Sequence, residues 1–115
     1  MDKAMSVGLE QEIIAELTTE LQGEPTFNAD ILAIKIRNAI RELKMKRNYA
    51  ATSFSETDIE KDLYNYYSTI VNVARYDYNQ LGAEGELSHS ENSVSRSWVD
   101  RDDLFKGVHA FVKVL

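Results

Sequence analysis

Apolar residues recur at intervals of three and four over most of the chain, which is the spacing typical of amphipathic α-helices. Glutamates occupy the other faces of the first such stripe, and Gly23 and Pro25 follow it, as expected just past a helix end. The pattern predicts a helix over about residues 9–22, preceded by a loose start over residues 1–7. Its apolar stripe consists of Leu9, Ile13, Ile14, Leu17 and Leu21.

A second helix is predicted to begin near Asn28, because asparagine is a good N-cap and Asp30 adds negative charge in the first turn. The apolar stripe of this helix is Leu32, Ile36, Ala39, Ile40 and Leu43. Five cations lie along the same helix and form the main basic patch of the sequence: Arg37, Arg41, Lys44, Lys46 and Arg47. A solvated helix face paired with acids is the favoured interpretation of this patch. The alternative is a small DNA-binding regulator that uses this helix.

A third, long helix is predicted over about residues 56–81, capped by Ser55 or Thr57 and closed by Gly82. This helix has two adjacent apolar stripes. The first stripe consists of Ile59, Leu63, Tyr66, Ile70 and Val73, and the second consists of Tyr64, Tyr67, Val71, Ala74 and Tyr78. Two explanations of this wide arc stay open. Either the helix packs against two partners from its own chain, or its tyrosine half faces a neighbouring subunit, since tyrosine is enriched in interfaces. The residues of the inter-subunit alternative are Tyr64, Tyr67, Val71 and Tyr78.

Residues 86–99 are polar and alternate with a period of two, which suggests a short hairpin. A lone two-stranded hairpin is marginal in water, so this segment needs contacts from elsewhere. Residues 100–106 are expected to form one helical turn ending at Gly107, and the apolar tail after it should dock on its own domain or on another chain.

The expected fold is therefore mainly α. It is a small bundle of three main helices plus a short C-terminal helix, with an extended polar hairpin or arm over about 83–99 and an extended C-terminal tail. We expect one domain over 1–115, with a helical core over about 9–82 and the short helix and tail over about 100–115.

Composition narrows the function classes. The 115 residues include no cysteine and two histidines and carry a net charge of −6, so disulfides and thiolate metal sites are excluded and a zinc site is improbable. A free nucleic-acid-binding domain usually has a basic excess, which this chain lacks. The sequence contains no recognisable membrane span, cofactor motif or phosphate loop. The Ser88-His89-Ser90 run is better explained as a solvated loop than as a nucleophile site. The acids Asp100, Asp102 and Asp103 are better explained as acids at a helix start than as metal ligands. We therefore expect no enzymatic activity and no metal.

The stretch GAEGELSHSENSVSRSW at residues 82–98, directly after the long helix, resembles a signature of the small head–tail connector proteins of long-tailed bacteriophages and prophages. These are also called adaptor or head-completion proteins. The signature reads approximately GxEGxxSHSENGxSRxY or W, and the likeness extends more loosely over about residues 27–115. Ser93 stands where the pattern has glycine, so a tight type I′ turn at Asn92 is less favoured.

The resemblance implies a structural virion protein at the head–tail interface, present in the host cytoplasm during assembly. Such proteins form a ring, commonly twelve-fold, beneath the portal protein, extend the DNA channel and present a surface to the next head-completion or tail protein. DNA would pass through without specific binding, which suits an acidic chain. The arm and tail residues that would contact neighbouring subunits or the portal are Glu86, Leu87, His89, Glu91, Asn92, Val94, Arg96, Trp98, Phe111 and Val112.

The second function class is a helical adaptor or regulatory protein that binds a protein partner as a monomer or dimer. Its binding face would be the tyrosine stripe of the third helix. The observation that discriminates the two classes is whether residues 86–99 are ordered only in an oligomer.

Overall fold

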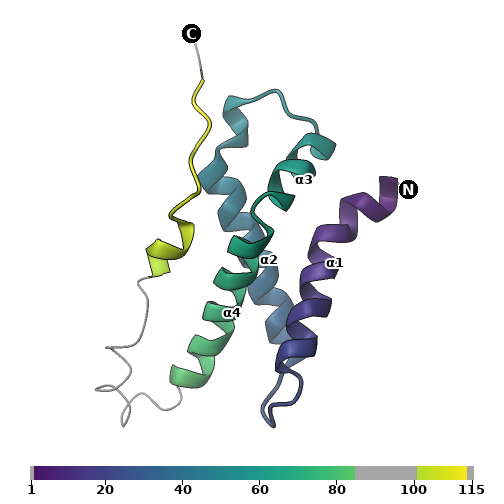
Figure 1. Cartoon of the computed structure of the whole chain (residues 1–115), viewed down its shortest axis with the longest axis vertical. Helices are drawn as coiled ribbons and strands as arrows, with labels where there is room; N and C mark the ends of the chain where they lie inside the picture. Colours follow the sequence, from purple (N-terminus) through teal and green to yellow (C-terminus); the bar gives the residue numbers. More distant parts are fainter. Residues whose placement is uncertain (1, 85–100, 114–115) are drawn as a thin grey trace.

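In the part of the chain that the structure describes, four α-helices form a small bundle and no strand occurs (Figure 1), so the mainly α fold is confirmed. The computed structural model describes residues 2–84 and 101–113, and within these the side chains of residues 8–80 and 101–113. The helices are α1 (Asp2–Leu21), α2 (Ala29–Arg47), α3 (Glu56–Tyr64) and α4 (Tyr67–Glu84). Two 3-10 turns accompany them, η1 (Tyr49–Ala51) and η2 (Arg101–Phe105).

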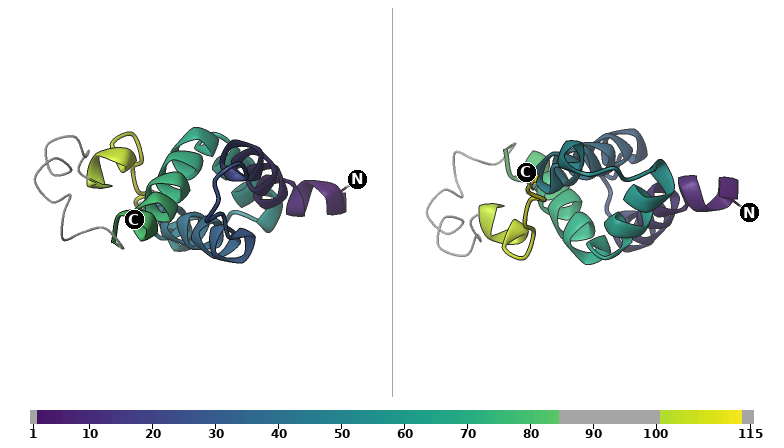
Figure 2. Two further views of the ribbon diagram at one scale, coloured as in Figure 1. Left: turned by 90° about the horizontal axis from the view of Figure 1, so that it is seen from below. Right: turned by 90° about the horizontal axis from the view of Figure 1, so that it is seen from above.

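The arrangement places α2 in contact with both α1 and α4, while α1 also contacts α3 and α4. The views along the bundle in Figure 2 show α1, α2 and α4 around a common centre. The turn η2 packs on α4, and in Figures 1 and 2 it lies on the side of the bundle away from α1. The helical turn predicted after residue 100 is therefore present, as a 3-10 turn.

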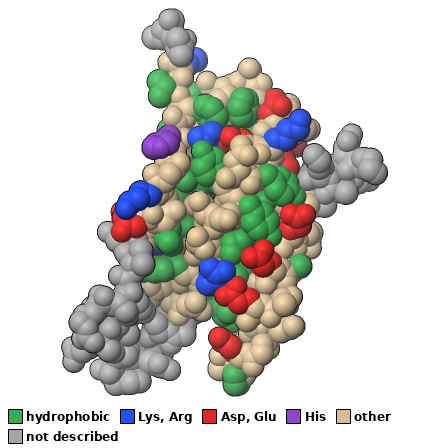
Figure 3. All heavy atoms as spheres, in the orientation of Figure 1, with side chains coloured by type: hydrophobic (Ala, Val, Ile, Leu, Met, Phe, Trp, Pro, Cys, Tyr) green, Lys and Arg blue, Asp and Glu red, His purple; other side chains and the backbone are tan. Residues whose placement is uncertain are grey.

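Helix α1 begins at Asp2, so the prediction of a loose start over residues 1–7 is wrong for residues 2–7. These residues include alanine, methionine and valine and no proline, so nothing in them stops a helix from extending past the apolar stripe. Acidic side chains gather on the α1 side of the molecule (Figure 3).

Gly8 allows α3 to approach α1 closely, because a Cβ at this position would lie 2.9 Å from the hydroxyl oxygen of Tyr64.

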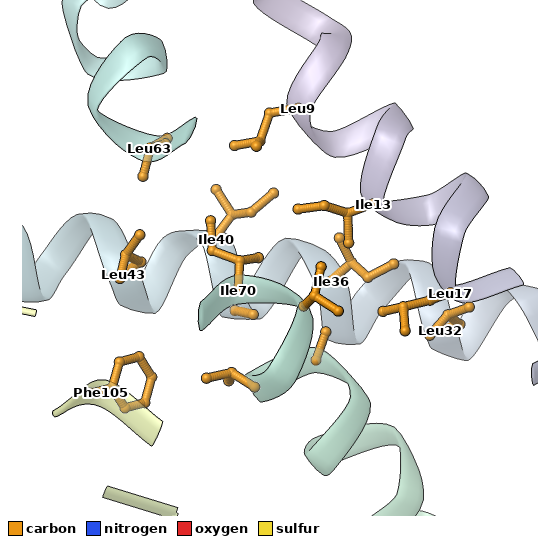
Figure 4. Close-up of a cluster of buried hydrophobic side chains, with 14 of the residues drawn as sticks. Leu9, Ile13, Leu17, Leu32, Ile36, Ile40, Leu43, Leu63, Ile70 and Phe105 are labelled. Carbon is orange, nitrogen blue, oxygen red and sulfur yellow. The ribbon is translucent and has the colours of Figure 1, made fainter. Parts of the chain in front are cut away.

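The core is built from one apolar stripe on each of the three longer helices, together with Leu63 of α3 and Phe105 of η2 (Figure 4). The stripes predicted for α1 and α2 are confirmed, apart from Ile14, which is only partly buried against the core. The largest side chains that are almost completely buried are Ile13, Leu17, Leu32, Ile36, Leu43, Leu63, Ile70 and Val73.

The predicted single helix over residues 56–81 is wrong, because the chain breaks it into α3 and α4 at Asn65 and Tyr66. The amides of these two residues bond to carbonyls three residues back, Asp62 O at 3.0 Å and Leu63 O at 2.8 Å, instead of the α-helical four. Asparagine and tyrosine are weak helix formers, so little local free energy opposes the break. Helix α4 then runs past Gly82 to Glu84, so residues 83–84 belong to the helix and not to the arm.

Two predicted helix starts are confirmed in atomic detail. The Asn28 side chain accepts a hydrogen bond from the amide of Ile31, as an N-cap should. At the start of α3, Ser55 accepts from the amide of Asp58 at 3.2 Å and the Asp58 carboxylate accepts from the amide of Ser55 at 3.1 Å. This reciprocal pair is a capping box, which satisfies two backbone donors at once.

Replacement of Ser55 by alanine should lower the free energy of unfolding by about 1 kcal/mol, because it leaves the amide of Asp58 without its cap. The measurement is urea denaturation followed by far-UV circular dichroism. Ser53→Ala, a change at an exposed serine just before the cap, is the matched control and should have little effect. Equal effects of the two substitutions would contradict the capping role.

Candidate functional site

The predicted interface residues fall into three groups in the structure. Eight of them lie outside the described residues: Glu86, Leu87, His89, Glu91, Asn92, Val94, Arg96 and Trp98. Phe111 and Val112 lie in the extended tail after η2, and the remaining four lie on α3 and α4. The candidate site is therefore built from the elements that hold the two ends of residues 85–100 and from those that hold the tail.

The tyrosine face of α3 and α4 packs largely within its own chain. Val71 is buried in the core, and the Tyr67 hydroxyl donates to Glu16 of α1 at 3.0 Å. Burial and the bond to this carboxylate raise the pKa of Tyr67 to about 12. The Tyr78 hydroxyl accepts from the amide of Asn28 at 2.9 Å, and Tyr64 is partly buried against the core. Of the two explanations left open by the sequence, packing within the chain accounts for these residues.

Arg101 fixes the first residue of η2 to two helices at once. Its guanidinium donates to both carboxylate oxygens of Glu42 on α2, at 3.1 and 2.8 Å. It also donates to both oxygens of Asp77 on α4, at 2.8 Å each. Hydrogen bonding to these two carboxylates raises the pKa of Arg101, and the same contact lowers the pKa of Glu42 against the opposing effect of burial. Phe105, one turn later, inserts its ring into the core.

The described residues on either side of 85–100 are both attached to α4. Glu84 ends this helix, and Arg101 is bound to Asp77 on it. Asp77 and Glu84 are separated by about 10 Å along the helix axis, at 1.5 Å per residue. The residues that flank 85–100 therefore share one helix as their support, and η2 packs against that helix.

A second arginine, Arg47 at the end of α2, forms a buried clamp with Asp62 of α3. Two nitrogens of Arg47 donate to the two oxygens of Asp62, at 2.8 and 2.9 Å, and Tyr49 donates to the same carboxylate at 2.6 Å. Burial raises the pKa of Asp62, but the hydrogen bonds from Arg47 and Tyr49 outweigh it and hold that pKa below its usual value. Arg47 is only 9% exposed and the Asp62 side chain 12% exposed, so the clamp is a largely buried contact in which the two charges are paired.

The clamp also holds the C-terminal tail. The remaining terminal nitrogen of Arg47 donates to the carbonyl of His109 at 2.6 Å, and the Arg47 carbonyl accepts from the amide of Phe111 at 2.8 Å. Asn48 donates from its side chain to the Phe111 carbonyl at 3.1 Å. Asn48 has left-handed backbone angles, with φ of 59°, which end α2 and turn its side chain toward the tail. The tail therefore docks on its own domain, one of the two outcomes expected from its apolar sequence.

An aromatic group completes the tail site. The Phe111 ring lies 5.2 Å from the ring of Phe54 and 6.0 Å from that of Tyr49, measured between centroids. The Arg47 guanidinium stacks over the Phe111 ring at 4.1 Å, a favourable cation–π distance. Val112, the next residue, is 78% exposed and points its side chain away from these contacts. Phe111 therefore serves the docking of the tail, whereas Val112 remains available at the surface.

The sequence reasoning missed the role of Arg47, which it grouped with the solvated cations of α2. Arg37 of that patch pairs with Glu10 at 3.0 Å, as the solvated interpretation predicts. Arg41 and Lys44 are exposed, and neither forms an ion pair with any residue in the described ranges. The sequence offered one signal for Arg47, which is its place directly before Asn48. Asparagine often ends a helix in the left-handed conformation, and the last helical residue before such a cap lies where the following chain turns back.

Other chemistry is limited within residues 2–84 and 101–113. These ranges contain no group of three histidine or acidic side chains that could hold a metal ion. An open hollow beside α3 is lined by Phe54, Asp58, Lys61, Asp62 and Asn65. Asp58 and Asp62 are already used in the capping box and the clamp. None of the helices in the described ranges combines the length and the apolar character that a membrane crossing requires.

Comparison of the chain with protein-family models, with curated proteins and with solved structures found no match.

Replacement of Arg47 by methionine should lower the free energy of unfolding by about 3 kcal/mol, because the largely buried carboxylate of Asp62 loses its ion-pair partner and keeps only the hydrogen bond from Tyr49. It should also speed amide hydrogen exchange at Phe111, because the tail loses the guanidinium bond to the His109 carbonyl and the stacking on the Phe111 ring that hold it against α2. Urea denaturation and hydrogen exchange with mass spectrometry measure the two effects. Arg41→Met is the matched control on an exposed face of the same helix, and it should change the free energy by less than about 0.5 kcal/mol.

Acid should weaken the fold in a defined range. The pKa values of Glu20, Glu42 and Asp62 are lowered in the folded state, so their ion pairs contribute fully above the ordinary carboxyl pKa of about 4. This contribution is lost as the pH falls through the lowered values. The free energy of unfolding should therefore decline steadily below about pH 4, measured by urea denaturation at each pH. The decline should be shallower in Arg47→Met, and an unchanged slope would contradict the clamp's part in it.

Proposed function

We propose that this chain is a structural subunit of a bacteriophage or prophage head–tail connector, which forms a ring beneath the portal protein. In this role it extends the DNA channel and joins the head to the next head-completion or tail protein. The proposal starts from the resemblance of residues 82–98 to the connector signature.

The observation that carries the proposal is the double mount of residues 85–100. Arg101 ties the far end of this segment to Glu42 and Asp77, and the near end continues directly from α4. An element that must reach a neighbouring subunit needs a rigid base, because ordering a loosely attached segment costs conformational entropy on binding. The signature segment has such a base on both sides.

Two further features support the same role. Val112 is exposed, and it belongs to the tail that Arg47 holds against the domain. The docked tail therefore presents an apolar side chain at the surface. The net charge of −6 suits a conduit that should not grip DNA. The competing role of a helical adaptor that binds through the tyrosine stripe has less support, since Tyr67 and Tyr78 use their hydroxyls within the chain.

Native mass spectrometry of the purified chain, alone and mixed with the portal protein encoded near its gene, tests the proposal. We expect a closed oligomer, or a monomer that assembles only on the portal, with twelve copies as the expected number. Deletion of the signature segment with a short glycine-rich replacement should abolish this assembly while circular dichroism shows the helical bundle intact. A monomer or dimer that is indifferent to the portal would overturn the connector role.

A further inference from the structure

The two longest described helices carry opposite charge. Helix α1 contains five acidic residues and one lysine, for a formal charge of −4. Helix α2 contains six basic and two acidic residues, for a formal charge of +4. A chain with an overall charge of −6 thus concentrates nearly half of its cations on one helix, next to a helix that is strongly acidic.

Part of the charge on α2 is not neutralised inside the chain. The arginines at positions 37, 47, 75 and 101 each bond to a carboxylate. Arg41, by contrast, hydrogen-bonds only to the side chain of Asn38, at 3.2 Å, and Lys44 beside it is exposed. Neither cation has a carboxylate partner among the described residues, although acids outnumber bases in the chain by nineteen to thirteen.

Two large apolar side chains accompany these cations. Ile34 is 49% exposed and Met45 is 78% exposed, and their spacing from Asn38 and Arg41 follows the three- and four-residue repeat of one helix face. We call this set the outer basic face: Ile34, Asn38, Arg41, Lys44 and Met45. Arginine and methionine are enriched at protein interfaces, and here two exposed apolar side chains accompany two cations that have no carboxylate partner in the described ranges.

Helix α1 presents the complementary surface. Glu12, Ala15, Glu16 and Thr19 are exposed on one side of the helix, and we call them the outer acidic face. Glu12 and Glu16 are four residues apart, an arrangement in which like charges destabilise a helix. Their neighbour Glu20 is neutralised by Arg75, but neither of the two pairs with a cation in the described ranges. One oxygen of Glu16 accepts from the Tyr67 hydroxyl, but a carboxylate accepts several hydrogen bonds, and both Glu12 and Glu16 are exposed to cations from outside the chain.

We propose that the outer basic face of one copy of this chain docks on the outer acidic face of the next copy. The attraction already operates once within the chain, where Arg37 of α2 pairs with Glu10 of α1 at 3.0 Å. Because the two faces lie on different helices, a single contact leaves one free face on each copy. Such head-to-tail contacts give a ring when the rotation between neighbouring copies closes, and every copy in the ring then uses both faces. This inference rests on the proposed function and names the contact between neighbours in the ring.

The absence of cysteine from the sequence makes a direct test possible, because two introduced thiols are the only ones present. One batch carries Met45→Cys and the other Ala15→Cys, and the batches are mixed with oxidised glutathione at low salt. We expect disulfide-linked heterodimers well above the statistical share, with few homodimers of either batch. Raising the ionic strength to about 0.5 M, where the screening length is about 4 Å, should reduce the yield.

Charge reversal then tests the pairing itself. Arg41→Glu with Lys44→Glu on the Met45→Cys copy should lower the heterodimer yield about tenfold, because like charges would face each other. Glu12→Lys with Glu16→Lys on the other copy should restore it. The control, Lys106→Glu with Lys113→Glu, makes the same change of net charge at exposed positions just after η2 and in the tail and should leave the yield unchanged.

A statistical mixture of dimers, or a yield that charge reversal does not change, would overturn the inference. So would salt-dependent binding of duplex DNA that Arg41→Glu with Lys44→Glu abolishes while the cross-linking yield stays the same. The charge-reversed chain is also assembled with the portal protein. If the charge-reversed chain still forms rings there, the inferred contact between the two faces is wrong, but the connector role is unaffected. If heterodimers form in a chain that never binds the portal, the contact is supported and the connector role is wrong.

Discussion

The buried pair of Arg47 and Asp62 is the contact on which the rest of the arrangement depends. One guanidinium uses its edge for the Asp62 carboxylate and for a tail carbonyl, and its faces for the rings of Tyr66 and Phe111. It thereby joins the end of α2, the short helix α3 and the tail at a single side chain. Lysine could not replace it, because only the planar guanidinium combines a bidentate bond with ring stacking. Removing either partner would leave the other charge without its ion-pair partner in a largely buried place.

Elsewhere, arginine–carboxylate pairs act as ties between neighbouring helices. Arg37 links α2 to α1, Arg75 links α4 to α1, and Arg101 links η2 to α2 and α4. These pairs are one-fifth to one-half exposed, and such contacts add little free energy individually. The ion pairs matter because they fix how the helices are aligned. The apolar stripes would tolerate some sliding and rotation of the helices, and the fixed geometry of guanidinium and carboxylate selects one alignment.

The sequence predicts the apolar core well, because residues that recur every three or four positions lie on the same face of a helix, and the apolar face is the one that is buried. Leu17, Ile36 and Val73 could each be assigned to the interior from spacing alone. The break at Asn65 was not predictable in this way, since both apolar stripes continue in phase across it and no glycine or proline marks it. The tail site escaped for a different reason. Its partners are 15 to 63 residues apart in the chain, so no local pattern reveals that Arg47 faces Asp62 and Asn48 faces Phe111.

The tie between Arg101 and Asp77 has a consequence for how this protein can change over evolutionary time. Glu84 and Arg101, which flank residues 85–100, are both held on α4, so the number of residues between them does not enter this tie. The entropic cost of closing a loop grows slowly with its length, by about 0.6 kcal/mol for each doubling. Insertions or deletions between these two residues should therefore leave the tie and the packing of η2 on α4 in place, so that this part of the chain can change independently of the bundle.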